Sequence, residues 1–229
     1  FLLHADTLDA VVSGSGELWL ENGVRSGSEN ADLQITQATT AANSIRLIVD
    51  GNVAADLVRA GPAAAGATLY NASITTPLGF DGVRITETNA ASRNIKINKV
   101  YGAVVALNAG TTVEQSVGSA LVADRLNLTT NEAVTLANLD IGTLDAVVRR
   151  AGDIDLTIGG SGDLVLQRVV TQDGMIEMDS ARNLILTTRT DSSNGVESGL
   201  VSGRTVDRTV PVSGEYSDLD IDGSGRVEL

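Results

Sequence analysis

Apolar residues recur along this chain in short triplets whose first and third members are apolar and whose middle member is often polar or charged. Successive residues of a strand point to opposite faces, so the outer members of each triplet share one face. The pattern therefore predicts many short strands with one buried face and one solvated face. Representative triplets are Leu33-Gln34-Ile35, Ile45-Arg46-Leu47, Ile95-Lys96-Ile97, Leu126-Asn127-Leu128 and Ile154-Asp155-Leu156.

Longer repeats indicate how these strands are spaced. The pattern Gly-Ser-Gly-x-[Leu/Val]-x-Leu occurs three times, around Ser15, Ser161 and Ser224. The separations of 146 and 63 residues are close to multiples of about 21 residues, a period typical of solenoid coils. The hexapeptide Thr7–Val12 also returns as Thr143–Val148. The two hexapeptides are 136 residues apart, ten fewer than the first separation of 146 residues. Ten residues is about half of a coil, which fits a coil made of two similar strand–turn halves.

These patterns predict an all-β chain that forms a right-handed parallel β-helix, or β-solenoid, with about 21 residues per coil. A single coil cannot bury its own apolar face, whereas stacked coils share one continuous interior. Hydrophobic residues make up 42% of the chain but aromatic residues only 3%, which suits a narrow aliphatic core. The 24 glycines fit many tight turns. We expect asparagine and serine at the corners to form hydrogen-bonded ladders along the stack.

The chain is expected to form one solenoid segment, residues 1–229, of a larger polypeptide, because both ends look like cuts in a longer sequence. Two stretches interrupt the pattern. Residues 51–79 include an alanine-rich run and are expected to form either a short helix with a protruding loop or a coil with wide turns. The polar residues 191–211 are expected to form a loop.

The triplets and their polar corners resemble the filamentous haemagglutinin-like repeat region of bacterial two-partner-secreted exoproteins. The resemblance is clearest in Ala123–Leu128, Ser161–Leu166 and Arg182–Thr187, and it extends loosely over most of the chain. It implies a right-handed β-helix that is exported to the bacterial cell surface and serves adhesion, biofilm formation or a filamentous layer. Such repeats define no functional residue, so none is transferred to this chain.

The resulting hypothesis is a structural or adhesive segment of an extracellular filamentous surface protein, without enzymatic activity. Its expected partners are further copies along the solenoid axis, neighbouring parts of the same polypeptide, and surface glycans or proteins. The formal net charge of −13 disfavours nucleic acid and anionic lipid as partners. No apolar stretch reaches the roughly 18 residues of a membrane-spanning helix, and the absence of cysteine excludes disulfides and thiolate metal sites.

One motif suggests a calcium-stabilised binding module as an alternative. Asp218, Asp220 and Asp222 alternate before Gly223 and match the start of a calcium loop. Glu228 falls one position early for the final ligand of an EF-hand, however. Leu219 and Ile221 also fit the strand triplet, in which case the aspartates line a solvated strand face. The sequence leaves both interpretations open, and calcium is the one cofactor that it suggests.

The other alternative, which ranks ahead of the calcium module, is a β-helical carbohydrate-active enzyme or a tailspike-like depolymerase. Such enzymes need paired carboxylates in a groove, and the candidate carboxylates are Asp153, Asp155 and Asp163. Basic residues lie nearby in the sequence, at Arg149, Arg150 and Arg168. Alternating acids and bases are also the ordinary outer surface of a solenoid.

The remaining polar features favour structural roles. His4 is the only histidine and lies beside Asp6, so a transition-metal site or catalytic triad has little support. The glycine-rich segments 14–16 and 159–162 lack the lysine of a phosphate-binding loop and are interpreted as coil corners. Arg93, Lys96, Lys99 and Tyr101 form the one basic cluster, interpreted either as a contact patch or as a solvated face.

Overall fold

Seventeen β-strands, and no helix, make up the regular structure of the described part of the chain. The computed structural model describes residues 2–3, 5–23, 31–64, 66–76, 93–180, 182–186, 199–201, 219–222 and 227–228. The strands are β1 (Leu2–Leu3), β2 (Thr7–Val12), β3 (Leu18–Asn22), β4 (Leu33–Thr40), β5 (Ile45–Val49), β6 (Val53–Ala60), β7 (Ala72–Thr75), β8 (Ile95–Asn108), β9 (Val113–Thr130), β10 (Val134–Ala151), β11 (Ile154–Ile158), β12 (Leu164–Asp173), β13 (Ile176–Ser180), β14 (Leu184–Leu186), β15 (Gly199–Val201), β16 (Leu219–Asp222) and β17 (Val227–Glu228).

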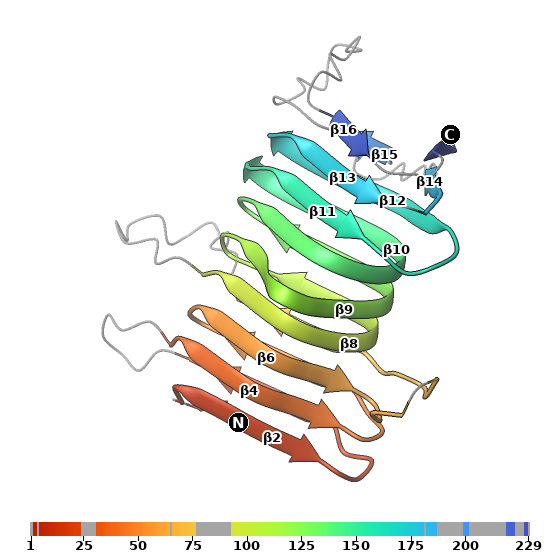
Figure 1. Cartoon of the computed structure of the whole chain (residues 1–229). Coiled ribbons are helices and arrows are strands. Elements are labelled where there is room, and N and C mark those ends of the chain that lie inside the picture. Colours follow the sequence, from red (N-terminus) through yellow and green to blue (C-terminus); the bar gives the residue numbers. More distant parts are fainter. Residues whose placement is uncertain are drawn as a thin grey trace, which may run out of the picture.

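All described pairings between these strands are parallel, which confirms the prediction of an all-β chain with parallel strands. Each pairing joins a strand of one coil to the equivalent strand of the next coil, after the backbone has made one complete turn around the solenoid axis. Val113 of β9, for example, pairs with Ile95 of β8 on one side and Val134 of β10 on the other. Val134 in turn pairs with Ile154 of β11. The outcome is a stack of coils that rises from the N-terminal to the C-terminal strands, as in a β-solenoid (Figure 1).

The apolar members of the triplets fill the interior of this stack. Ile95 and Ile97 are fully buried while Lys96 between them is exposed, and Ile154 and Leu156 enclose an exposed Asp155 in the same way. Equivalent residues in adjacent coils lie above one another, so leucine, isoleucine and valine form one continuous core. Parallel pairing therefore buries the apolar surface that a separate coil would expose.

A corner of the coils carries the expected hydrogen-bonded ladder. The Asp32 carboxylate accepts a hydrogen bond of 2.7 Å from the backbone N–H of Asn52. The side-chain oxygen of Asn52 accepts one of 2.9 Å from the N–H of Asn94. The side-chain oxygen of Asn94 then accepts from the hydroxyls of Thr111 and Thr112. Aspartate and threonine thus share the role that the sequence assigned to asparagine and serine.

Residues 51–79 contribute two strands to the stack. The helical alternative is wrong over β6, and β7 follows after a connection in which residues 61–64 and 66–71 are described and contain no helix. The connection is tied to the stack because the N–H of Tyr70 donates to the carbonyl of Ala60, and the carbonyl of Tyr70 accepts from the N–H of Ala103. Alanine-rich composition alone suggested helix here, but pairing with β4 and β8 stabilises the extended backbone of β6. Residues 77–79 lie outside the described part.

Of the predicted loop at residues 191–211, the structure describes only β15, which pairs with β12. The other residues of that range lie outside the described part of the chain. No helix within the described part is long and apolar enough to cross a membrane.

Candidate functional site

A shallow groove of about 420 Å³ lies across the first coils, where β4, β6 and β8 begin. Leu33, Val53 and Ala54 contribute to its floor, and of these three Ala54 is the one with a partly exposed side chain, since Leu33 and Val53 belong to the buried core. Ala54 lies in register between Gln34 of β4 and Lys96 of β8. Because the methyl group of Ala54 is much shorter than either neighbour, it leaves the space between them open. We name this surface the Ala54 groove.

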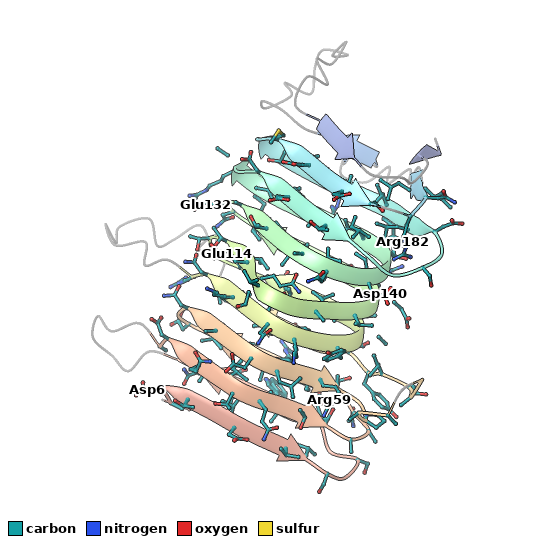
Figure 2. All side chains as sticks on the ribbon, in the orientation of Figure 1. Asp6, Arg59, Glu114, Glu132, Asp140 and Arg182 are labelled. Atoms are coloured by element: carbon teal, nitrogen blue, oxygen red, sulfur yellow. The ribbon has the colours of Figure 1, made fainter. Side chains whose placement is uncertain are left out.

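The walls of the Ala54 groove carry hydrogen-bonding groups of several kinds. Carboxylates come from Asp6, Asp32 and Glu114, and carboxamides from Gln34, Asn52 and Asn94, with Lys96 as the cation. Figure 2 shows Asp6 and Glu114 on the same side of the stack. Closely spaced donors and acceptors above an apolar floor are suited to a polyhydroxylated ligand such as a sugar.

The corner ladder stiffens one wall of this groove. Asp32, Asn52 and Asn94 are held by hydrogen bonds between successive coils, so their positions are defined before a ligand arrives. Gln34 is held as well, since its side-chain N–H donates to the Asp56 carboxylate at 3.3 Å. Preorganised polar groups lose little conformational freedom on binding.

Replacing Asn94 by alanine is expected to lower the free energy of unfolding by about 1–2 kcal/mol, because it removes hydrogen bonds between two coils. Asn98→Ala, which removes a carboxamide from β8, the strand that directly follows Asn94, is the matched control. Urea denaturation of both variants measures the difference. An equal loss in the two variants would contradict a stabilising role for the ladder.

An exposed aromatic residue lies on another face of the stack. The indole of Trp19 on β3 is 55% exposed, and the guanidinium carbon of Arg46 on β5 lies 5.1 Å from its ring centroid. Trp19 and Arg46 are directly paired in the register of these strands, and Ser73 of β7 follows in the same row. This cation–π pair offers a flat apolar ring bordered by hydrogen-bond donors.

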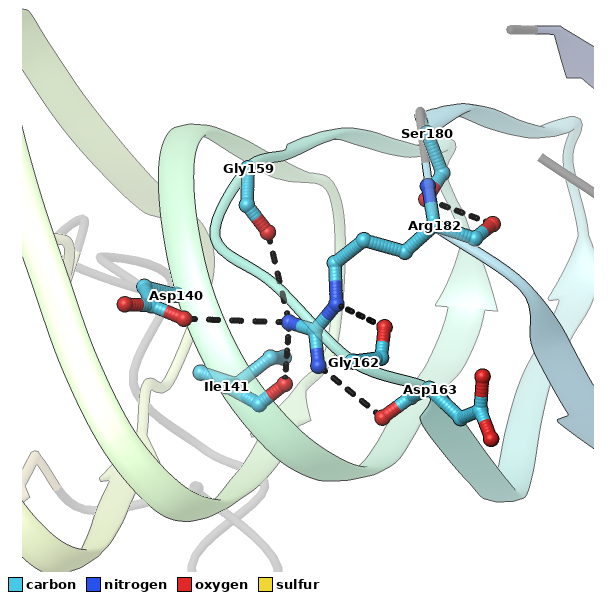
Figure 3. A network of polar contacts seen from close by, with 7 residues as sticks. All are labelled: Asp140, Ile141, Gly159, Gly162, Asp163, Ser180 and Arg182. Atoms are coloured by element: carbon cyan, nitrogen blue, oxygen red, sulfur yellow. Dashed lines mark hydrogen bonds and ion pairs between the residues drawn. The ribbon is translucent and has the colours of Figure 1, made fainter. Parts of the chain in front are cut away.

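The side chain of Arg182 lies in a network of polar contacts with several neighbouring turns and is structural in character (Figure 3). Its side chain is only 5% exposed. The guanidinium donates to the carbonyl of Ile141 at 2.6 Å and to that of Gly159 at 3.2 Å. It also donates to the carbonyls of Gly162 and Asp163, each at 2.9 Å. Arg182 therefore joins three successive turns of the chain. In the sequence, it is marked only as an arginine that Asn183 separates from the triplet Leu184-Ile185-Leu186.

The carboxylates proposed for the enzymatic alternative have separate partners. Asp153 accepts a hydrogen bond from the backbone N–H of Met175 at 2.8 Å, and Asp163 accepts one from the Asn183 side chain at 2.9 Å. Asp155 is exposed on β11, in register with Glu177 of β13. Within the described ranges, no three histidine or acidic side chains come close enough together to hold a metal ion.

The basic residues considered from the sequence are also dispersed. Arg168 forms an ion pair of 2.9 Å with Asp145, and Arg149 and Arg150 are exposed on β10. Arg93 pairs with Asp50 at 3.4 Å. Lys96 belongs to the Ala54 groove, whereas Lys99 is not among its lining residues. The sequence therefore identified one residue of the groove in its basic cluster but did not predict the groove.

The other candidates fall at or beyond the edge of what the structure describes. Asp220 and Asp222 belong to β16, whose side chains lie outside the description, as does Asp218 altogether. His4 also lies outside it. Gly160 and Gly162 have positive φ angles of 79° and 82°, which agrees with their interpretation as coil corners.

Comparison of the chain with protein-family models, with curated proteins and with solved structures finds no match in any of the three.

Proposed function

We propose that this chain is a rigid, adhesive segment of an extracellular bacterial filamentous surface protein, of the filamentous haemagglutinin-like kind. In this proposal it forms a right-handed parallel β-helix with about 21 residues per coil. The observation that carries the proposal is the continuous parallel pairing of strands around an aliphatic core, with polar side chains on the outside. Paired residues in β8 to β11 lie 18 to 21 residues apart, which supports the coil length.

The stack supports a mechanical role because each coil contacts only its neighbours. Adding coils therefore lengthens the rod while the cross-section of its core stays the same. The Ala54 groove supports an adhesive role. Its carboxylates, carboxamides and lysine are able to exchange hydrogen bonds with sugar hydroxyls, and the methyl group of Ala54 is able to contact the apolar face of a sugar ring. Surface glycans are therefore the proposed ligands.

Binding of the purified chain to an array of bacterial and host polysaccharides tests this role. We expect retention of specific glycans and at least a fivefold loss of binding when Lys96→Ala and Glu114→Ala are combined, because both side chains line the groove. Asp155→Ala with Glu177→Ala, a register pair on the same sheet outside the groove, is the matched control. Absence of glycan binding, or equal losses in both variants, would contradict the adhesive proposal. Release of sugar fragments would instead favour the depolymerase alternative.

A calcium-stabilised module is the second candidate, and one observation favours it. The register of β13 and β16 pairs Glu177 with Asp220 and Asp179 with Asp222, so four acidic positions meet on adjacent strands. Directly opposed acidic positions repel one another unless a cation binds between them. We expect calcium to raise the midpoint of thermal unfolding if such a site forms, by mass action. An unchanged midpoint after addition of EDTA would exclude this candidate.

A further inference from the structure

Two neighbouring basic side chains lack an acidic partner. Arg59 lies near the end of β6 (Figure 2). Tyr101 of β8 is in register with Arg59, and Lys99 lies two residues before Tyr101 on the same strand. Within the described part of the chain, neither Arg59 nor Lys99 forms an ion pair or a side-chain hydrogen bond, and the Nε atom of Arg59 is buried without an acceptor. We name these two residues the basic pair.

Several other arginines find their partners inside the chain. Arg93 and Arg168 form ion pairs with aspartates, Arg182 donates to carbonyls, and the guanidinium of Arg46 lies over Trp19. Acidic residues outnumber basic residues by 29 to 16. Two adjacent cations that none of the described acids neutralises therefore indicate an acidic partner outside the chain.

An acidic surface with the opposite imbalance lies further along the stack. Asp155 of β11 and Glu177 and Asp179 of β13 are exposed. Asp155 is in register with Glu177, and like charges in this arrangement repel one another. Among the described residues, no cation or hydrogen-bond donor contacts these three carboxylates. We name them the acidic stripe.

The basic pair and the acidic stripe have complementary geometry. From Arg59, Lys99 lies one strand further along the stack and two residues back. From Asp155, Asp179 lies one strand further along and two residues forward. Diagonal neighbours of this kind are about 7–8 Å apart on a sheet. When the outer faces of two parallel rods meet, their strands run in opposite directions across the contact, so the two diagonals coincide.

We infer that the basic pair docks laterally against the acidic stripe of a second copy of this chain. Arg59 and Lys99 then face Asp155 and Asp179, and each surface supplies the charge that the other lacks. Four pairing steps, through β8, β9 and β10, separate β6 from β11. Neighbouring copies are therefore staggered by about 19 Å along the axis.

This contact joins two different surfaces, so each copy can bind one neighbour through its basic pair and another through its acidic stripe. Contacts of this heterologous kind build open assemblies unless they close into a ring. The inference adds a partner to the proposed rod and rests on that proposed function only for the use of the assembly. Lateral docking is measured without glycans, so the two proposals can fail separately.

The test is a charge exchange between the two surfaces, followed by sedimentation velocity of the full chain at rising concentration in EDTA. Arg59→Glu with Lys99→Glu, and separately Asp155→Lys with Asp179→Lys, are each expected to weaken self-association about tenfold. An equimolar mixture of the two variants is expected to restore it, because glutamates then face lysines. Arg125→Glu with Arg149→Glu, which changes exposed arginines elsewhere by the same total charge, is the matched control.

Loss in each variant, recovery in the mixture and an unchanged control would support the inference. Arg59→Gln with Lys99→Gln repeats the first loss should the glutamates disturb folding. A parent chain that stays monomeric at every concentration, or a mixture that associates no better than its components, would overturn it. Binding of polygalacturonate or heparin that disappears with Arg59→Glu and Lys99→Glu, without self-association, would overturn it in favour of an anionic polysaccharide.

Discussion

Arg182→Ala is expected to lower the free energy of unfolding by about 3–5 kcal/mol, one of the two largest effects anticipated in this chain. The guanidinium donates to four backbone carbonyls, and two of these, on Ile141 and Gly162, belong to different turns of the stack. Its removal leaves the buried carbonyl of Ile141 without this donor and opens a cavity at the corner. Thermal or urea unfolding monitored by circular dichroism measures the loss.

Two further variants show which property of Arg182 matters. Arg182→Lys retains the positive charge, but its three donors sit on one nitrogen and cannot all reach carbonyls that surround a planar guanidinium. We therefore expect lysine to restore less than half of the free energy of unfolding that Arg182→Ala loses. Asp140→Asn is expected to cost less than about 1 kcal/mol, because this ion pair is 3.8 Å long and the carboxylate is 56% exposed. A large effect of Asp140→Asn with a small effect of Arg182→Lys would show that charge pairing, rather than bonding to carbonyls, dominates.

Gly174→Ala is expected to destabilise the chain by about 3 kcal/mol, at the upper end of the range for overpacking. A β-carbon on Gly174 would lie 2.2 Å from the carbonyl oxygen and 2.5 Å from the carbonyl carbon of Gly152 in the preceding coil. That oxygen also accepts a 2.6 Å hydrogen bond from the Thr171 hydroxyl. The clash therefore involves backbone, which moves only if the spacing between coils changes.

Gly14→Ala is the matched control for this prediction. No atom lies within 4 Å of a β-carbon built on Gly14, so its replacement is expected to change stability by less than about 1 kcal/mol. Urea denaturation compares the two variants under identical conditions. Equal effects would indicate that glycine acts through the flexibility of the unfolded chain rather than through close packing between coils.

The features that depend on local sequence were predictable. Alternation within triplets such as Ile95-Lys96-Ile97 and Ile154-Asp155-Leu156 correctly identified strands, their buried faces and their exposed middle residues. The reason is that side-chain direction in a strand depends only on the extended backbone. The segment around Val53 was ambiguous from the sequence because its alanines do not by themselves favour an extended backbone. Pairing with β4 and β8 stabilises the strand there.

The candidate site could not be predicted from the sequence. The Ala54 groove joins residues from Asp6 to Glu114 that come together only when coils stack. Its opening depends on Ala54 lying between Gln34 and Lys96, which are 20 residues before it and 42 after it in the chain. Nothing in the local pattern around Ala54 reveals that register.

By itself, the sequence determined that the chain is built of short strands with aliphatic interiors and polar corners. Only the tertiary structure decided which coil lies on which. That choice placed the guanidinium of Arg182 among carbonyls of earlier turns and Gly174 against Gly152. The physical reason is that these contacts depend on the register between coils, which is determined by packing of the whole stack rather than by any one segment.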